Sequence, residues 1–162
     1  MHMENFKSQK NDYLLDFLIS NIDNKDLMLD TLGVNETLIP ILKNVSQKGE
    51  PYGDGLTISY MKKFYLLGLS FSEIGKLKGI TEDGVRYNIK TLYSKKEWSQ
   101  IKYTHYLNRR ELKDKILYCD LKPLIASYGL EETSNQLGYK QSYLDRLWKQ
   151  LSKKYEVILI EG

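Results

Sequence analysis

The sequence predicts a mainly α-helical fold, made of tandem trihelical helix-turn-helix units with a small β element. Three observations lead to this prediction. Apolar residues recur at helical spacing along most of the 162-residue chain. Glycines at the ends of these segments divide them into short helices. Two stretches, residues 101–106 and 155–160, instead have the alternation or the β-branched composition of strands.

The composition favours a cytoplasmic protein without a membrane partner. Hydrophobic residues make up 41% of the chain, enough to form a core, and charged residues of both signs make up 28%. No apolar run approaches the about 20 residues that span a bilayer, and no secretory signal pattern opens the chain. Cys119 is the only cysteine, so an intrachain disulfide is excluded.

Residues 1–50 are expected to form an acidic helical module. Amphipathic helices are predicted at residues 12–22 and 25–32, and Gly33 ends the second one in the left-handed conformation. The module carries five basic and eight acidic side chains, a net charge of 5 − 8 = −3. We therefore expect it to serve packing or homodimerisation, or to bind a protein partner, rather than to contact a polyanion.

A second domain is predicted over residues 56–106. The helix that precedes it, within residues 36–46, should begin near Pro40 or be kinked there, because proline lacks the backbone N–H and clashes with the preceding turn. Residues 46–55 are rich in glycine and polar groups and are interpreted as a linker. Thr57 then caps the first helix of the domain.

Two further helices joined by a short turn follow within this domain. Ser70 and Glu73 have the S-x-x-E spacing of a capping box, which predicts a helix start. Gly79 ends that helix, and Thr81 caps the next one. Gly75 is expected where the two helices approach closely. This arrangement of a helix, a three- to four-residue turn and a helix is typical of DNA-binding proteins.

The segment resembles the promoter-binding helix-turn-helix of bacterial sigma factors and response-regulator activators, roughly L-S-x-x-E-I-A-x-x-L-G-I-S-x-x-T-V-x-x-x-L. The chain departs from this pattern where Gly75, Lys78 and Gly84 replace an alanine, an apolar residue and a threonine. The resemblance covers residues 57–93 and implies a DNA-binding trihelical unit whose second helix enters the major groove. The matching residues are Leu69, Ser70, Glu73, Ile74, Gly79, Ile80, Val85 and Ile89.

Charge supports a polyanionic partner for this region. Residues 51–162 carry 19 basic and 13 acidic groups, a net charge of 19 − 13 = +6, and nine basic groups against three acids lie between Arg86 and Lys115. A solvated lysine-rich surface on a helical hairpin without a ligand is the alternative. The candidate DNA contacts are Thr81, Glu82, Arg86, Tyr87 and Lys90, with Lys95, Lys96, Arg109 and Arg110 expected to hold phosphates.

Residues 107–162 are predicted to form a second, more divergent helix-turn-helix unit with a C-terminal strand. Residues 130–151 repeat the frame of the first unit, with Ser134 at the small-residue position, Gly138 in the turn and Tyr139 directed into the core. Either this unit also reads DNA or its role is purely structural. Its candidate contacts are Lys140, Gln141, Ser142, Arg146 and Lys149, residue types that contact base edges or phosphates.

The two strand-like stretches are expected to pair, because an isolated strand is unstable. They would form a wing beside a DNA-reading unit, which makes the winged helix one version of this fold. For four side chains outside or within these stretches we also predict whether they are buried or exposed. We expect Trp98 and Tyr103 in the core, Cys119 buried and His105 on the surface.

No catalytic constellation, metal-ligand pattern or phosphate-binding loop is present, so neither enzymatic activity nor a cofactor is expected. The leading hypothesis is sequence-specific binding of double-stranded DNA by a transcriptional regulator. A second hypothesis is a DNA-binding accessory factor of a phage, plasmid or other mobile element that acts in replication, transfer or packaging. A third is a protein-interaction module that binds RNA polymerase or a repressor through residues 1–50.

Overall fold

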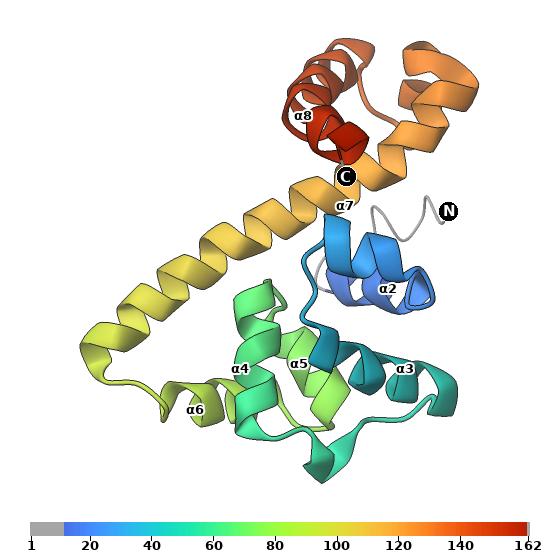
Figure 1. The fold of residues 1–162 in the computed structure, drawn as a ribbon. Coiled ribbons are helices and arrows are strands. Elements are labelled where there is room, and N and C mark those ends of the chain that lie inside the picture. The colour runs from blue at the N-terminus through green and yellow to red at the C-terminus, as the bar shows by residue number, and fades with distance from the viewer. Residues whose placement is uncertain (1–11, 162) are drawn as a thin grey trace.

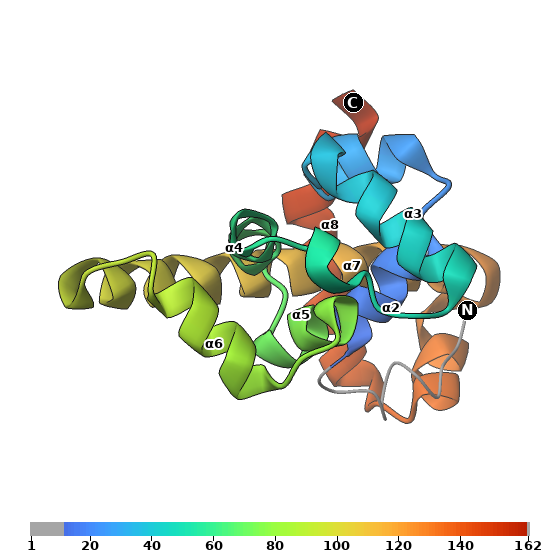
Figure 2. The same cartoon turned by 90° about the horizontal axis from the view of Figure 1, so that it is seen from below.

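The computed structural model describes residues 12–161, and the side chains of residues 12–156. One long helix, α7, crosses the molecule (Figures 1 and 2). Helices α2 to α5 lie on one side of it, with α2 and α4 packed against it, and α8 packs at its far end. The elements are α2 (Tyr13–Ser20), a π-helical turn (Leu27–Thr31), a 3-10 turn (Glu36–Leu38), α3 (Ile39–Lys48), a 3-10 turn (Gly53–Gly55), α4 (Ile58–Leu67), α5 (Phe71–Lys78), α6 (Glu82–Lys90), α7 (Lys95–Leu137) and α8 (Gln141–Glu161).

The prediction of a mainly α-helical protein is confirmed, but the predicted β element is wrong. Residues 12–161 contain no strand: residues 101–106 lie in α7 and residues 155–160 in α8. A six-residue alternation is short, and residues 101–106 are also compatible with a helix because they place Ile101 and His105 on one helical face. The weak helix propensity of β-branched residues costs only tenths of a kcal/mol each, roughly, which a helix already under way overcomes.

Helix α7 is continuous except for one break. Gly129 has φ 79° and ψ 170°, outside the helical region, so residues 95–128 and 130–137 form two helical segments. The first segment is roughly 50 Å long at 1.5 Å per residue. It begins beside α6 and ends beside α8, and therefore joins the two ends of the molecule (Figure 1).

The first hydrophobic core extends from Leu14 in α2 to Ile116 in α7. It includes Met28 and Leu42 of the predicted N-terminal module together with Phe64 of the predicted second domain, all nearly or completely buried. The two predicted domains thus pack around one shared core. The acidic N-terminal helices therefore share their hydrophobic core with α5 and α6.

A second core lies around the last third of the chain. Tyr118, Leu121, Leu137 and Leu144 are buried within it, and Trp148 stacks on Tyr118 with ring centroids 5.2 Å apart. These residues come from both segments of α7 and from α8. Three helical segments therefore surround this second core.

The side chain of Glu73 is the polar centre of the first core and is completely buried. Its Oε1 accepts a hydrogen bond from the backbone N–H of Ser70 at 2.9 Å and from Nη1 of Arg109 at 2.8 Å. Its Oε2 accepts one from the backbone N–H of Leu15 at 2.7 Å. Because Ser70 caps α5, Leu15 lies in the first turn of α2 and Arg109 belongs to α7, one carboxylate joins three helices.

Helix α7 also binds the C-terminal end of α4 through one polar face. His105, Asn108 and Arg109 reach backbone carbonyl oxygens within residues 66–69, at 2.9, 2.7 and 2.9 Å respectively. The last carbonyl groups of a helix have no N–H donor within the helix, and these side chains provide hydrogen-bond partners for them. The expected surface position of His105 is wrong, since the ring is half-buried and stacks on Tyr65 with centroids 3.8 Å apart.

Predictions from local sequence signals are mostly confirmed. The capping box of Ser70 and Glu73 forms, Thr57 and Thr81 cap α4 and α6, and Gly33 has φ 68°. Pro40 lies in the first turn of α3, where proline is tolerated.

Among the predicted core side chains, Trp98 is buried as expected, but two others differ. Tyr103 is 62% exposed, because it lies on the side of α7 that faces away from α4. Cys119 is only partly buried, although its burial still raises the pKa of the thiol to about 11. None of the helices in the described part of the chain is both long and apolar enough to cross a bilayer.

Replacing Arg109 with methionine should lower the free energy of unfolding by about 3–5 kcal/mol, because Glu73 would keep a buried charge without its cationic partner. Urea denaturation measures this change. Arg110→Met is the matched control: its guanidinium is exposed and lies 5.7 Å from the ring centroid of Tyr106, so the loss should be about 1 kcal/mol or less. Equal losses in the two variants would contradict the structural role of Arg109.

The half-buried His105 should make stability depend on pH. Burial lowers the pKa of His105 from 6.5 to about 4, so the folded protein favours the neutral ring. Its contribution is complete above pH 6.5 and is lost as the pH falls towards 4, because the unfolded chain takes up a proton that the folded chain does not. His105→Gln keeps a hydrogen-bond donor but cannot titrate.

Denaturation of both proteins between pH 4 and 8 tests this dependence. The stability of the wild-type protein relative to His105→Gln should decrease as the pH falls through this range. A difference that is constant with pH would show that the ring is not held in its neutral form.

Candidate nucleic-acid-binding surface

The first candidate surface is built on α5, the turn after it and α6. Gly79 ends α5 with φ 93°, and the backbone N–H of Ile80 donates to the carbonyl of Gly75 at 3.0 Å. A Cβ atom on Gly75 would lie 2.6 Å from the carbonyl oxygen of Ile80, too close for any side chain. The expected close approach at Gly75 therefore exists, but it is to the turn itself.

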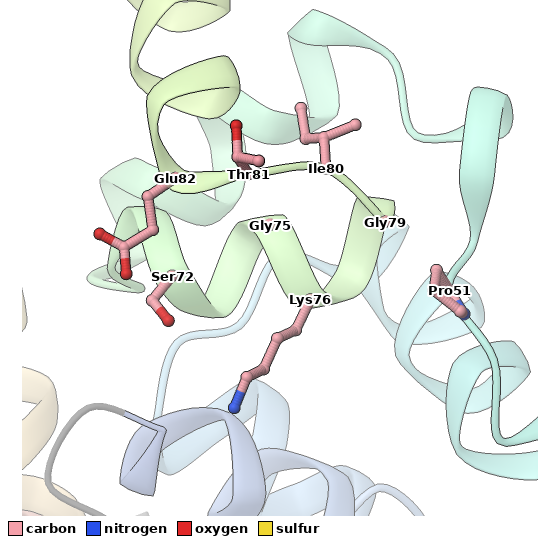
Figure 3. A pocket seen from close by; sticks show the side chains of 8 residues that line it. All are labelled: Pro51, Ser72, Gly75, Lys76, Gly79, Ile80, Thr81 and Glu82. Atoms are coloured by element: carbon pink, nitrogen blue, oxygen red, sulfur yellow. The ribbon is translucent and has the colours of Figure 1, made fainter.

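Figure 3 shows the hollow that this turn creates, with a volume of about 560 Å³. Ser72 lines it from α5, and Thr81 and Glu82 line it from the start of α6. Lys76 also borders it, but its ammonium group is paired with Asp12 at the start of α2. The acidic side chain at the start of α6 thus faces an open space.

Helix α6 buries one face and exposes the other. Val85 and Ile89 are completely buried, whereas Tyr87 is 70% exposed. Arg86 donates to Asp83 at 2.7 Å, and its guanidinium carbon lies 5.1 Å from the ring centroid of Phe71. The candidate residues of α6 therefore share one solvent-facing side; they are Glu82, Arg86, Tyr87 and Lys90.

The second candidate surface has the same backbone frame. The segment of residues 130–137 ends at Gly138 with φ 74°, and the N–H of Tyr139 donates to the carbonyl of Ser134 at 2.9 Å, as Ile80 donates to Gly75. The turn glycines are 138 − 79 = 59 residues apart, and the same offset relates Ser134 to Gly75. The turns after residues 78 and 137 thus share a glycine cap and its hydrogen bond, as does the end of α4 at Gly68, where the N–H of Leu69 donates to the carbonyl of Phe64 at 3.1 Å.

The outer side of α8 carries the candidate residues of the second unit. Leu144 is buried beneath them, at the offset position of Val85. Lys149 forms an ion pair with Asp145 at 3.2 Å. The exposed candidate residues are Lys140, Gln141, Ser142, Arg146 and Lys149.

The candidate phosphate contacts on α7 separate into two groups. Lys95, Lys96 and Arg110 are exposed. Arg109 is directed inward, where its side chain is only 17% exposed and its Nη1 is bonded to Glu73 and to the carbonyl of Gly68. We therefore leave Arg109 out of the candidate surface.

The junction of α6 and α7 forms a hollow that the sequence did not predict. Its volume is about 440 Å³, and it brings together Tyr87, Lys90 and Lys95, three of the candidate residues. We call it the junction pocket; its other lining residues are Thr91, Tyr93, Ser94 and Trp98. Ser94 and Glu97 form a second capping box, so the S-x-x-E spacing of residues 94–97 is a local signal that would have placed this helix start.

Comparison of the chain with protein-family models, with curated proteins and with solved structures found no match in any of the three. Within the part of the chain whose side chains are described, no three His, Cys, Asp or Glu side chains gather as metal ligands.

Proposed function

We propose that the protein binds double-stranded DNA in a sequence-specific manner and regulates transcription. The two helix pairs, α5 with α6 and residues 130–137 with α8, carry this proposal. In each repeat a glycine turn presents a second helix whose inner side is buried and whose outer side is exposed, polar and free of large aliphatic residues. This is the arrangement by which a helix-turn-helix unit places its second helix in the major groove.

The two outer faces differ in charge, which supports different roles for them. On α6, Glu82 and Asp83 balance Arg86 and Lys90. A balanced face contributes little general attraction to DNA, but its residue types can select bases, since arginine pairs with guanine and glutamate accepts from the amino group of cytosine. We therefore assign base selection chiefly to α6.

The outer face of α8 is better suited to electrostatic attraction of DNA. Lys140, Arg146 and Lys149 outnumber Asp145, and Gln141 adds an amide that can pair with adenine. The exposed Lys95, Lys96 and Arg110 of α7 add positive charge between the two units. Release of counterions by these cations would make binding depend strongly on salt.

We infer that one chain contacts two grooves of the same duplex. Its first segment has the two helix pairs at its two ends and is packed against α2 and α4. A rigid connection of this kind fixes the separation of the two second helices, as dimerisation does in proteins with one unit per chain. Within this proposal the spacing of the two DNA half-sites is set by α7.

Arg86→Ala and Lys96→Ala should weaken DNA binding in different ways. A duplex selected from a random pool and a shuffled duplex serve as ligands, and fluorescence anisotropy gives the dissociation constants. Arg86→Ala should reduce the preference for the selected duplex by about 1–3 kcal/mol, because a base contact is lost. Lys96→Ala should weaken both duplexes alike and reduce the salt slope by about 1.

Lys48→Ala, at the exposed end of α3, is the charge-matched control and should leave binding unchanged. Because Arg86 also contacts Asp83 and Phe71, thermal unfolding of Arg86→Ala must first show an intact fold. An equal loss of affinity for both duplexes in Arg86→Ala would count against base reading by α6.

A further inference from the structure

The junction pocket between α6 and α7 has features that base reading by α6 does not use. Its volume of about 440 Å³ falls in the range of small-molecule sites, about 300–1,000 Å³. It opens beside the outer face of α6, because Tyr87 and Lys90 belong to both. A ligand seated there would lie next to any DNA held by α6.

The charge of the junction pocket favours an anion. Lys90 lines it from the last residue of α6 and Lys95 from the first residue of α7, and none of its lining residues is acidic. Neither lysine forms an ion pair with another residue in the described part of the chain. Glu97, the nearest acid along α7, accepts a hydrogen bond from the backbone N–H of Ser94 at 2.9 Å.

The backbone at the start of α7 adds donors. The Oγ of Ser94 accepts from the N–H of Glu97 at 3.2 Å, and its carbonyl accepts from the N–H of Trp98 at 2.8 Å. The N–H groups of Lys95 and Lys96, in the first two helical positions, have no acceptor within the helix. Such groups, at the positive end of the helix dipole, are common phosphate ligands.

An independent observation is the hydroxyl of Tyr93. It is buried and has no hydrogen-bond partner among the described residues, although Tyr93 lines the junction pocket. A buried hydroxyl without a partner is destabilising, so such groups usually have a ligand or water as their partner. The hydroxyl is covered in this structure, so a phosphate oxygen becomes its acceptor only when the side chains over it shift.

From these features we infer that the junction pocket binds the phosphate group of a nucleotide, with the sugar or base against the exposed ring of Tyr87. Aromatic rings beside lysines are a common platform for nucleotide units. The phosphate has two sources, the DNA backbone beside the groove that α6 occupies or a free nucleotide that acts as an effector. For the first source the inference rests on the proposed DNA binding.

Trp98 provides a direct reporter of the junction pocket. The chain has two tryptophans, so Trp148→Phe leaves Trp98 as the sole indole, and far-UV circular dichroism checks that this background is folded. Inorganic phosphate, deoxyadenosine and dAMP are titrated against its fluorescence. The duplex source is tested separately, with the selected duplex carrying one neutral methylphosphonate linkage at a time.

Three variants and one control identify the site. Lys90→Gln and Lys95→Gln should each raise the dissociation constant of the phosphate ligand at least fivefold. Tyr93→Phe should weaken it about threefold to tenfold without lowering the melting temperature, since it removes only a hydroxyl that has no protein partner. Lys113→Gln, an exposed lysine of α7 outside the junction pocket, should have no effect.

Binding of dAMP and phosphate, but not of deoxyadenosine, with these variant effects would support a free nucleotide, even if no duplex binds. If one methylphosphonate position weakens duplex binding by the wild-type protein but not by Lys90→Gln or Lys95→Gln, the DNA backbone is the source of the phosphate. If neither occurs, the inference is overturned, and tight duplex binding that persists would leave the proposed function intact.

Discussion

The buried carboxylate of Glu73 is the interaction on which the arrangement of the first unit depends. A charge removed from water destabilises the fold unless it is paired and hydrogen-bonded. Glu73 meets this requirement with one neighbouring group, the backbone of Ser70, and two distant ones, from Leu15 and Arg109. The backbone of Ser70 fixes the start of α5, Leu15 brings in the first turn of α2, and Arg109 brings in α7. The position of α6 follows, because it is joined to α5 by a turn of only three residues.

Because of this network, part of the basic segment between Arg86 and Lys115 stabilises the fold and is not available to a polyanion. Arg109 belongs to that segment in sequence, yet it acts inside the protein, as do its neighbours His105 and Asn108, which bind the end of α4. The first segment of α7 therefore has a structural side and an exposed side. Only the exposed side, with Lys95, Lys96 and Arg110, contributes to the electrostatic field that a polyanion would meet.

Features that depend on neighbouring residues could be predicted from the sequence, whereas features that join distant segments could not. The capping box of Ser70 and Glu73 and the turn at Gly79 follow from spacing alone, but no local signal pairs Glu73 with Leu15 or Arg109. The strand predicted at residues 101–106 was wrong because six residues fit two periodicities, and contacts with α4 decide between them. The junction pocket is a local feature of residues 87–98, and it was missed because the S-x-x-E spacing of residues 94–97 was not interpreted as a helix start.

We propose that the two helix pairs at the ends of the first segment of α7 bind DNA, with base selection by the outer face of α6 and electrostatic attraction by the outer face of α8. The most direct test is fluorescence anisotropy of the wild-type protein with random-sequence duplexes and with fragments from around its own gene, at two salt concentrations. A sequence-specific DNA-binding protein should bind tightly, and its binding should weaken steeply with salt and favour one fragment. Absence of binding at low salt would contradict this proposal, and binding of equal strength to every duplex would contradict base reading by α6.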